Sequence, residues 1–143
     1  MPSRPSPRLG PSRTILKVSE RQESTEETDA GEPQKIAAAY IAAWRGKEFD
    51  TLRALLAEEF EYVGPLARLD SPEACRESLE RMSPVTTDLA VEQVFVSGAD
   101  VVTWFTLHTT IAPPTPVANW IHVEDGKINR IRAVYDPRAL LSD

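Results

Sequence analysis

Hydrophobic and polar residues alternate along the last third of the chain, which predicts β-strands. Four segments read as strands, at about 88–96, 101–111, 117–123 and 128–136, and the last two alternate between their faces. Asp125-Gly126 separates the last two segments, and this dipeptide between alternating runs is a strong signal for a tight hairpin turn. We therefore expect four consecutive strands that form a meander.

Helical spacing precedes this region. Apolar residues recur at intervals of three and four from Ile36 to Trp44, and Gly46 is expected to end this first helix. Asp50 is the expected cap of a second, short helix, and the leucines up to Leu56 form its inner side. Both helices then have an apolar side that needs a sheet to cover it.

A short strand and a third helix complete the pattern. Residues 60–63 read as a strand that Gly64-Pro65 stops. Ser71-Pro72 supplies a capping hydroxyl and a proline for the first turn of the third helix, which carries Met82 on one side. Because the helices are segregated from the meander, the order predicts an α+β fold and not a parallel α/β sheet.

The first 32 residues differ in composition from the rest. Proline and serine are dense there, and large apolar side chains are few. Such a segment buries too little surface to offset the entropy lost on ordering. We expect a disordered tail at 1–32 and one domain at 33–143. An Arg- and Ser-rich start also fits a transit peptide, although an amphipathic helical pattern is lacking.

Charge and cysteine content exclude several classes of function. The formal net charge of −6 argues against a nucleic-acid partner, and the apolar runs are far too short to span a membrane. Cys75 is the sole cysteine and the chain has two histidines, so neither an internal disulfide nor a zinc site is expected. A cytoplasmic location is the simplest expectation.

One face of the segment 117–123 is apolar apart from a single amide. Val117, Ile121 and Val123 share that face with Asn119. If the row lines a cavity, Asn119 is a polar group in apolar surroundings, which is how many small-molecule sites are built. If it lies in a packed core, the amide binds neighbouring backbone.

Two stretches carry a resemblance to a known family. These are A-A-Y-I-A-A-W-R-G-K-E-F-D-T-L near the first helix and W-I-H-V-E-D-G-K-I-N-R-I-R-A-V-Y-D-P near the end. Together with the element order, they resemble the nuclear transport factor 2-like superfamily, and within it the SnoaL-like group, over residues 33–141. The resemblance implies a cone-shaped roll: a strongly curved antiparallel or mixed sheet wrapped around three N-terminal helices. Relatives include ketosteroid isomerases, polyketide cyclases, limonene-epoxide hydrolases and binders without catalysis.

The resemblance also implies roles for particular residues. Ketosteroid isomerases use a tyrosine on the first helix and an acid on a late strand as oxyanion donors, and Tyr40 and Asn119 match these positions. Their aspartate base falls at Gly64 here, so the base is missing. The Asp-Arg-Asp set of the epoxide hydrolases has no match, because Arg130 and Arg132 lie on the opposite face.

The expected catalytic residues are therefore Tyr40 and Asn119. The expected substrate-binding wall comprises Trp44, Tyr62, Met82, Phe105, Leu107, Ile121 and Tyr135, with Asp136 at the rim. Each of these has a structural alternative: the aromatic and aliphatic residues also fit a packed core, and Asp136 before proline also fits a turn.

The two histidines fall on the other face of the predicted sheet. His108 shares that face with Trp104, and His122 shares it with Trp120. A base must reach its proton, so neither histidine is the expected base. Two exposed tryptophans on adjacent strands leave apolar area in water, and we expect a homodimer through this outer face.

These observations predict a small-molecule enzyme of the SnoaL-like type. It would act on a hydrophobic carbonyl-bearing or cyclic substrate by acid–base or enolate-stabilising chemistry, as an isomerase, cyclase or hydrolase without metal or organic cofactor. The first alternative is a pocket that binds a small ligand without chemistry. The second is an interaction module that works through the outer sheet face.

Overall fold

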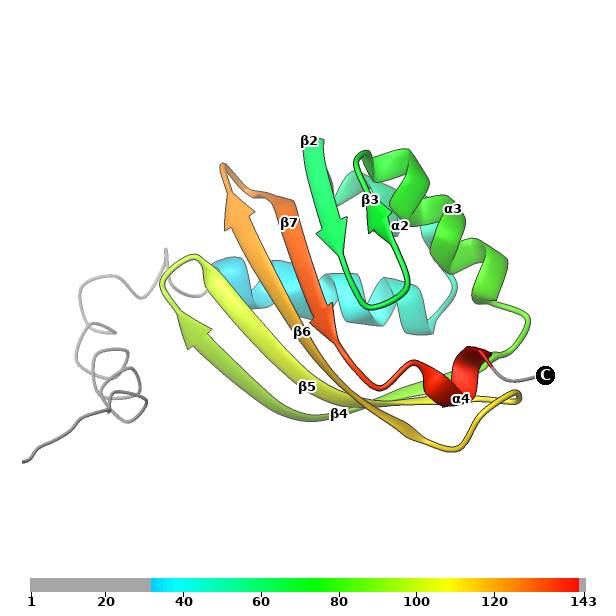
Figure 1. Cartoon of the computed structure of the whole chain (residues 1–143). Coiled ribbons are helices and arrows are strands. Elements are labelled where there is room, and N and C mark those ends of the chain that lie inside the picture. Colours follow the sequence, from blue (N-terminus) through cyan, green and yellow to red (C-terminus); the bar gives the residue numbers. More distant parts are fainter. Residues whose placement is uncertain (1–31, 142–143) are drawn as a thin grey trace, which may run out of the picture.

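The structure is a computed structural model that describes residues 32–141. A helix covers residues 32–45, and the remaining helices are α2 (Phe49–Ala54), α3 (Pro72–Met82) and α4 (Arg138–Leu141). The strands are β2 (Leu56–Val63), β3 (Arg68–Leu69), β4 (Thr86–Ser97), β5 (Asp100–Thr109), β6 (Thr115–Glu124) and β7 (Lys127–Val134). Figure 1 shows the 32–45 helix behind the strands and α3 beside the short β3. Our expectation of a disordered tail falls, apart from Glu32, outside the described residues.

The sheet is mixed and has six strands in the order β3-β2-β7-β6-β5-β4. The four long strands from β4 to β7 pair with their sequence neighbours in antiparallel fashion, which confirms the predicted meander. β2 joins this meander in parallel beside β7, where Tyr62 is paired with Ile131. The α+β class is confirmed, whereas the cone-like curvature of the sheet stays a prediction.

The hairpin between β6 and β7 has the turn that its sequence predicts. Asp125 and Gly126 have φ angles of 54° and 78°, so both adopt the left-handed conformation of a type I′ turn. Glu124 is paired with Lys127 across this turn. The turn fixes the pairing of Val123 with Ile128, and beyond a register shift after His122 the alternation of β6 sets the face to which Asn119 points.

Of the two predicted helix caps, one is confirmed and one is wrong. The Ser71 hydroxyl accepts a hydrogen bond from the Ala74 N–H at 3.1 Å, and Pro72 occupies the first turn of α3, as predicted. Asp50 is not the cap of α2, because Glu48 takes that position without a side-chain hydrogen bond. The Asp50 carboxylate instead pairs with Arg76 of α3 at 2.9 Å.

The end of α2 also differs from the prediction. Leu56 was expected on the inner side of this helix, but it is the first residue of β2 and pairs with Ile128 of β7. The 32–45 helix does end just before Gly46, yet Lys47 is the residue that takes a left-handed φ of 59°.

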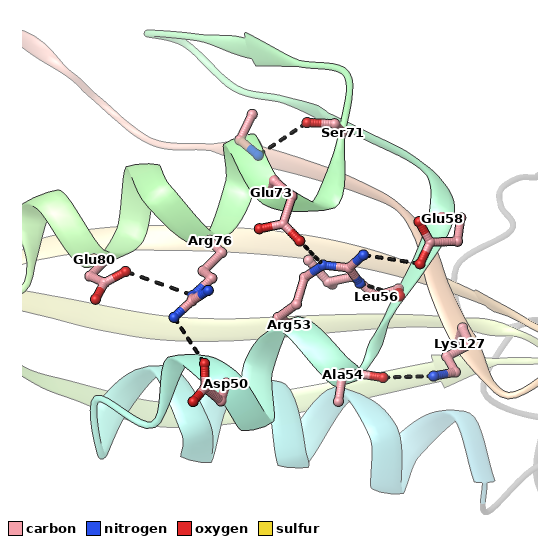
Figure 2. Close-up of polar contacts among 11 residues, drawn as sticks. Asp50, Arg53, Ala54, Leu56, Glu58, Ser71, Glu73, Arg76, Glu80 and Lys127 are labelled. Atoms are coloured by element: carbon pink, nitrogen blue, oxygen red, sulfur yellow. Dashed lines mark hydrogen bonds and ion pairs between the residues drawn. The ribbon is translucent and has the colours of Figure 1, made fainter.

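Ion pairs and a hydrogen bond join α2 to α3 and to the strands β2 and β7, as Figure 2 shows. The Arg53 guanidinium lies 2.6 Å from the Glu73 carboxylate of α3 and 3.0 Å from that of Glu58 on β2. Lys127 of β7 donates to the Ala54 carbonyl at 2.8 Å. Exposed pairs contribute only about 0.2–1 kcal/mol each, so this network orients α3 more than it stabilises the fold.

The hydrophobic core lies between the helices and the inner face of the sheet. Leu52 of α2, Phe105 of β5 and Ile121 and Ile131 of the central strands are each 0% exposed. In the described part of the chain, no helix combines the length and the hydropathy needed to cross a bilayer.

Candidate functional site

A cavity of about 300 Å³ lies next to this core. Its wall combines the end of the 32–45 helix, the connection between β2 and β3, one side of α3, inner positions of β5 to β7, and Leu140 of α4. The expected site residues on the wall are Tyr40, Trp44, Tyr62, Met82, Leu107, Asn119 and Tyr135. The structure thus brings the tyrosine and the amide singled out from the sequence to one cavity.

Tyr40 lies on the buried side of the 32–45 helix and is 2% exposed. Its hydroxyl is 3.9 Å from the Cys75 sulfur, a distance at which either group can donate. Burial raises the pKa of the Tyr40 hydroxyl well above its ordinary value and that of the Cys75 thiol to about 11. Both groups are therefore neutral near pH 7, and one of them donates to the other.

Asn119 owes its position to the alternation of β6. Alternate residues of this strand are buried, and Asn119 is 3% exposed between Thr103 of β5 and Ala133 of β7. Its side-chain Nδ2 is buried and has no hydrogen-bond partner among residues 32–141. A buried donor without an acceptor costs about 1–3 kcal/mol, so the fold carries a penalty at this point.

Trp44 presents a second unpaired donor. Its indole Nε1 is buried and has no partner in the part of the chain that the structure describes, while its ring packs edge-on against Tyr40 at 6.1 Å and Phe105 at 5.6 Å. The neighbouring rings fix the orientation of the indole. Trp44 and Asn119 thus both offer N–H groups for which the wall supplies no acceptor.

Tyr62 and Tyr135 form a hydroxyl pair on another part of the wall. Burial, as the largest cause, raises the pKa of both hydroxyls. A Cβ atom added at Gly64 would collide with the Tyr62 hydroxyl. The family base was expected at Gly64, and here a tyrosine side chain fills the space that a longer residue at Gly64 would need.

Three expected site residues lie away from the cavity. Phe105 and Ile121 are 0% exposed and belong to the packed core. Asp136 is exposed and pairs with Arg138 at 2.6 Å, and this hydrogen bonding lowers the pKa of its carboxyl to about 2. It is a strand-end acid held by its neighbour.

The wall carries no carboxylate and no imidazole among its residues. Its ionisable groups are the tyrosines, Cys75 and the guanidinium of Arg81. Of these, no neutral tyrosine or thiol with a raised pKa is a ready proton acceptor at pH 7. Among residues 32–141 there is also no group of three or more His, Cys, Asp or Glu side chains that fits a metal ion.

Sequence reasoning missed several wall residues. Cys75, Ser78, Leu79 and Arg81 reach the cavity from α3 together with Met82. Their spacing of three to four residues marks one side of a helix, so this signal was available. Leu66, in the connection before β3, has no periodic pattern, and its place on the wall follows only from the fold.

The outer sheet face has a different chemistry. Trp104 and Trp120 are 40% and 39% exposed. The Trp120 indole N–H donates to the Asp100 carboxylate at 2.8 Å, and the Nδ1 of His122 lies 2.9 Å from the same oxygen. Both expected outer-face histidines thus lie off the cavity wall.

Comparison with solved structures finds the same fold in many proteins. A nuclear transport factor 2-like protein of unknown function from Cytophaga hutchinsonii matches with a TM-score of 0.71 and 22% identity, covering 77% of this chain and 95% of the other. A putative ketosteroid isomerase from Kribbella flavida matches with a TM-score of 0.69 and 18% identity, covering 76% and 80%. An epoxide hydrolase-like protein of M. tuberculosis matches with a TM-score of 0.67 and 23% identity, covering 77% and 86%.

These likenesses show the fold, whose members include isomerases, cyclases, hydrolases and proteins of unknown function. The comparison with curated protein sequences gives no match. The family model described as a SnoaL-like domain matches residues 37–131, which include most of the first helix, α3 and most of the sheet. The chain therefore belongs to the SnoaL-like domain family.

Proposed function

We propose that this protein takes a small, mainly apolar molecule into the cavity and binds an acceptor oxygen of that molecule. The observation that carries the proposal is the pair of buried, unpaired donors, Asn119 Nδ2 and Trp44 Nε1, on one wall. Tyr40 adds a neutral hydroxyl to the same wall. A bound carbonyl oxygen would supply the acceptor that the protein lacks, so ligand binding would remove a penalty that folding leaves.

The chemistry that suits these donors is stabilisation of charge on the ligand oxygen. We propose that Tyr40 and Asn119 stabilise an enolate-like oxygen, as in an isomerase or cyclase. Removing one such donor typically raises the barrier by about 2.7–4 kcal/mol. Because the wall carries no carboxylate or imidazole, the substrate would need an acidic C–H bond whose proton passes to water.

A second candidate is a binding protein without chemistry. The absence of a base on the wall and the Tyr62 hydroxyl beside Gly64 favour it. Both candidates share the ligand class, a hydrophobic carbonyl-bearing or cyclic molecule. They differ in whether the carbon next to the carbonyl exchanges its hydrogen.

Native mass spectrometry of protein purified from its own host tests the shared part. We expect a retained small molecule on the wild-type protein, and less of it on Asn119→Leu, which keeps the volume and removes the donor. Asp136→Asn, which lies off the wall, is the matched control. A ligand retained equally by all three proteins would contradict the proposal.

Hydrogen exchange separates the two candidates. The released ligand is incubated in heavy water with wild-type protein and with Tyr40→Phe. Deuterium uptake next to the carbonyl that depends on wild-type protein supports the enzyme. No uptake above the protein-free rate, with binding intact, supports the binding protein.

We also propose that two copies associate through the outer sheet face, in the cytoplasm. Trp104 and Trp120 lie exposed on this face together with the half-buried His108 and His122. Apolar area of this kind on adjacent strands marks many interfaces. Light scattering tests it: Trp120→Asp is expected to halve the mass, and an unchanged mass would contradict it.

A further inference from the structure

The charge of the cavity wall contrasts with that of the whole protein. The chain has 22 acidic and 16 basic residues and a formal net charge of −6. No aspartate or glutamate lies on the wall, while one fully charged side chain, Arg81, does. Arg81 is also exposed, so it stands where the cavity meets solvent. The wall is thus locally positive in an acidic protein.

Arg81 differs from every other arginine between residues 32 and 141. Each of the others contacts a carboxylate or, in the case of Arg132, lies over the Trp120 ring. Arg76 on the same helix pairs with Asp50 and Glu80, as Figure 2 shows. Arg81 has no such partner within the described part of the chain. Its guanidinium is left with its five donors toward cavity and solvent.

Ser78 lies one helical turn before Arg81 and also reaches the wall. A hydroxyl and a guanidinium one turn apart on one side of a helix offer donors to the same small anion. A planar carboxylate matches the fork of an arginine with two parallel hydrogen bonds. The last turn of a helix also favours a cation by itself, which is the competing explanation for Arg81.

We propose that the ligand of this cavity carries a carboxylate, which binds Arg81 and Ser78 at the opening while its apolar body lies between α3 and the sheet. This inference rests on the proposed function, because the same ligand gives its second oxygen to Asn119 and Trp44 in the interior. The substrate class is then an apolar keto acid or a related oxo acid. Apolar residues between the two polar ends, such as Leu79 and Met82, contact its hydrophobic part.

Three probes separate the two ends of the ligand. Benzoylpropionate has a ketone and a carboxylate, its methyl ester keeps the ketone without the charge, and phenylbutyrate keeps the carboxylate without the ketone. Affinities are measured by calorimetry with the full-length chain, for wild type, Arg81→Gln and Asn119→Leu. Lys35→Gln is the matched control, because Lys35 is an exposed cation without an ion pair among residues 32–141 and lies off the wall.

We expect wild type to bind the acid about fivefold more tightly than the ester, since an exposed ion pair is worth at most that factor. Arg81→Gln should abolish this preference and Lys35→Gln should keep it, and the preference should shrink at high salt. An acid-to-ester ratio that Arg81→Gln leaves unchanged overturns the inference, and Arg81 then serves only the end of α3.

The Asn119→Leu variant tests the proposed function separately. Asn119→Leu should remove the advantage of benzoylpropionate over phenylbutyrate and keep the acid-to-ester ratio. If that advantage survives in Asn119→Leu, the proposed function fails even where the Arg81 result holds. If none of the three probes binds saturably to wild type, both the function and the inference fail.

Discussion

Two tryptophans show how differently the two faces of the sheet treat a polar group. Trp120 is 39% exposed on the outer face, and its N–H donates to Asp100 at 2.8 Å. Trp44 is packed on the inner side, and its buried N–H has no acceptor. The exposed Trp120 N–H, which can donate to water, has a protein acceptor. The buried Trp44 N–H, which needs a protein acceptor, has none among residues 32–141.

The same contrast holds for Asn119 and His122, which both lie on β6. His122 binds Asp100 on the outer face, whereas the Asn119 Nδ2 on the inner face is unpaired. Folded proteins generally pair their buried hydrogen-bond donors, because an unpaired buried donor costs more free energy than a formed hydrogen bond contributes. Asn119 Nδ2 and Trp44 Nε1 are thus two buried donors on one cavity wall that lack an acceptor among residues 32–141.

The largest expected effect separates two adjacent residues of β5. Phe105 is 0% exposed and supports Trp44, whereas Trp104 is 40% exposed on the other face. Phe105→Ala should lower the free energy of unfolding by about 3–5 kcal/mol, because it leaves a hole under the cavity wall. Trp104→Ala should cost the isolated chain far less. Urea unfolding at low protein concentration measures both, and equal losses would contradict the inside-outside contrast.

The next effect has opposite signs on the two faces. Asn119→Leu should raise the free energy of unfolding without ligand by about 1–2 kcal/mol, since it removes an unpaired buried donor. Asp100→Ala should lower it by about 1 kcal/mol, because it breaks made hydrogen bonds on the outer face. If Asn119→Leu lowers the free energy of unfolding as Asp100→Ala does, the contrast between the two faces is contradicted.

How far the sequence predicts this molecule depends on whether a signal is local. The Asp125-Gly126 turn and the Ser71-Pro72 cap are set by neighbouring residues, and both were found. The spacing of Leu56 predicts a helix residue. Its pairing with Ile128, far along the chain, makes it a strand residue instead. Long-range pairing of this kind overrides local propensity.

The candidate site was predictable to a similar extent. Alternation along β6 assigns Asn119 to the inner face, and the resemblance points to Tyr40. Alternation does not say which inner residues meet the cavity and which meet a helix. Leu107 lies on the cavity wall, whereas Phe105 on the same face of β5 is covered. This difference depends on how the helices pack against the sheet, which alternation does not report.

A smaller effect appears at alkaline pH. Burial raises the pKa of the Cys75 thiol from 9.0 to about 11, so the folded state keeps a proton that the unfolded chain loses in this window. Stability from this group is complete below pH 9 and falls as pH rises toward 11. Cys75→Ser should flatten the fall in urea midpoint across the window. The remaining slope comes from Tyr40, Tyr62 and Tyr135, whose pKa values burial raises in the same direction. An identical slope in both proteins would contradict the placement of Cys75.

The smallest effect is expected at Asp136, which lies away from the cavity wall. Asp136 is exposed and held by Arg138, and its carboxyl has a pKa lowered to about 2 by that hydrogen bonding. Asp136→Asn should therefore leave ligand affinity and deuterium uptake unchanged between pH 5 and 8, a range in which the carboxyl stays ionised. A clear loss of uptake would make Asp136 the missing base.

Infrared difference spectroscopy of bound benzoylpropionate tests the central claim most directly, because the ketone frequency reports hydrogen bonds to its oxygen. In wild type, the ketone band should lie below its position in an apolar solvent, and in Asn119→Leu it should move back up while the probe stays bound. A ketone band at the same frequency in both bound proteins would contradict the claim that the inner donors await a ligand oxygen.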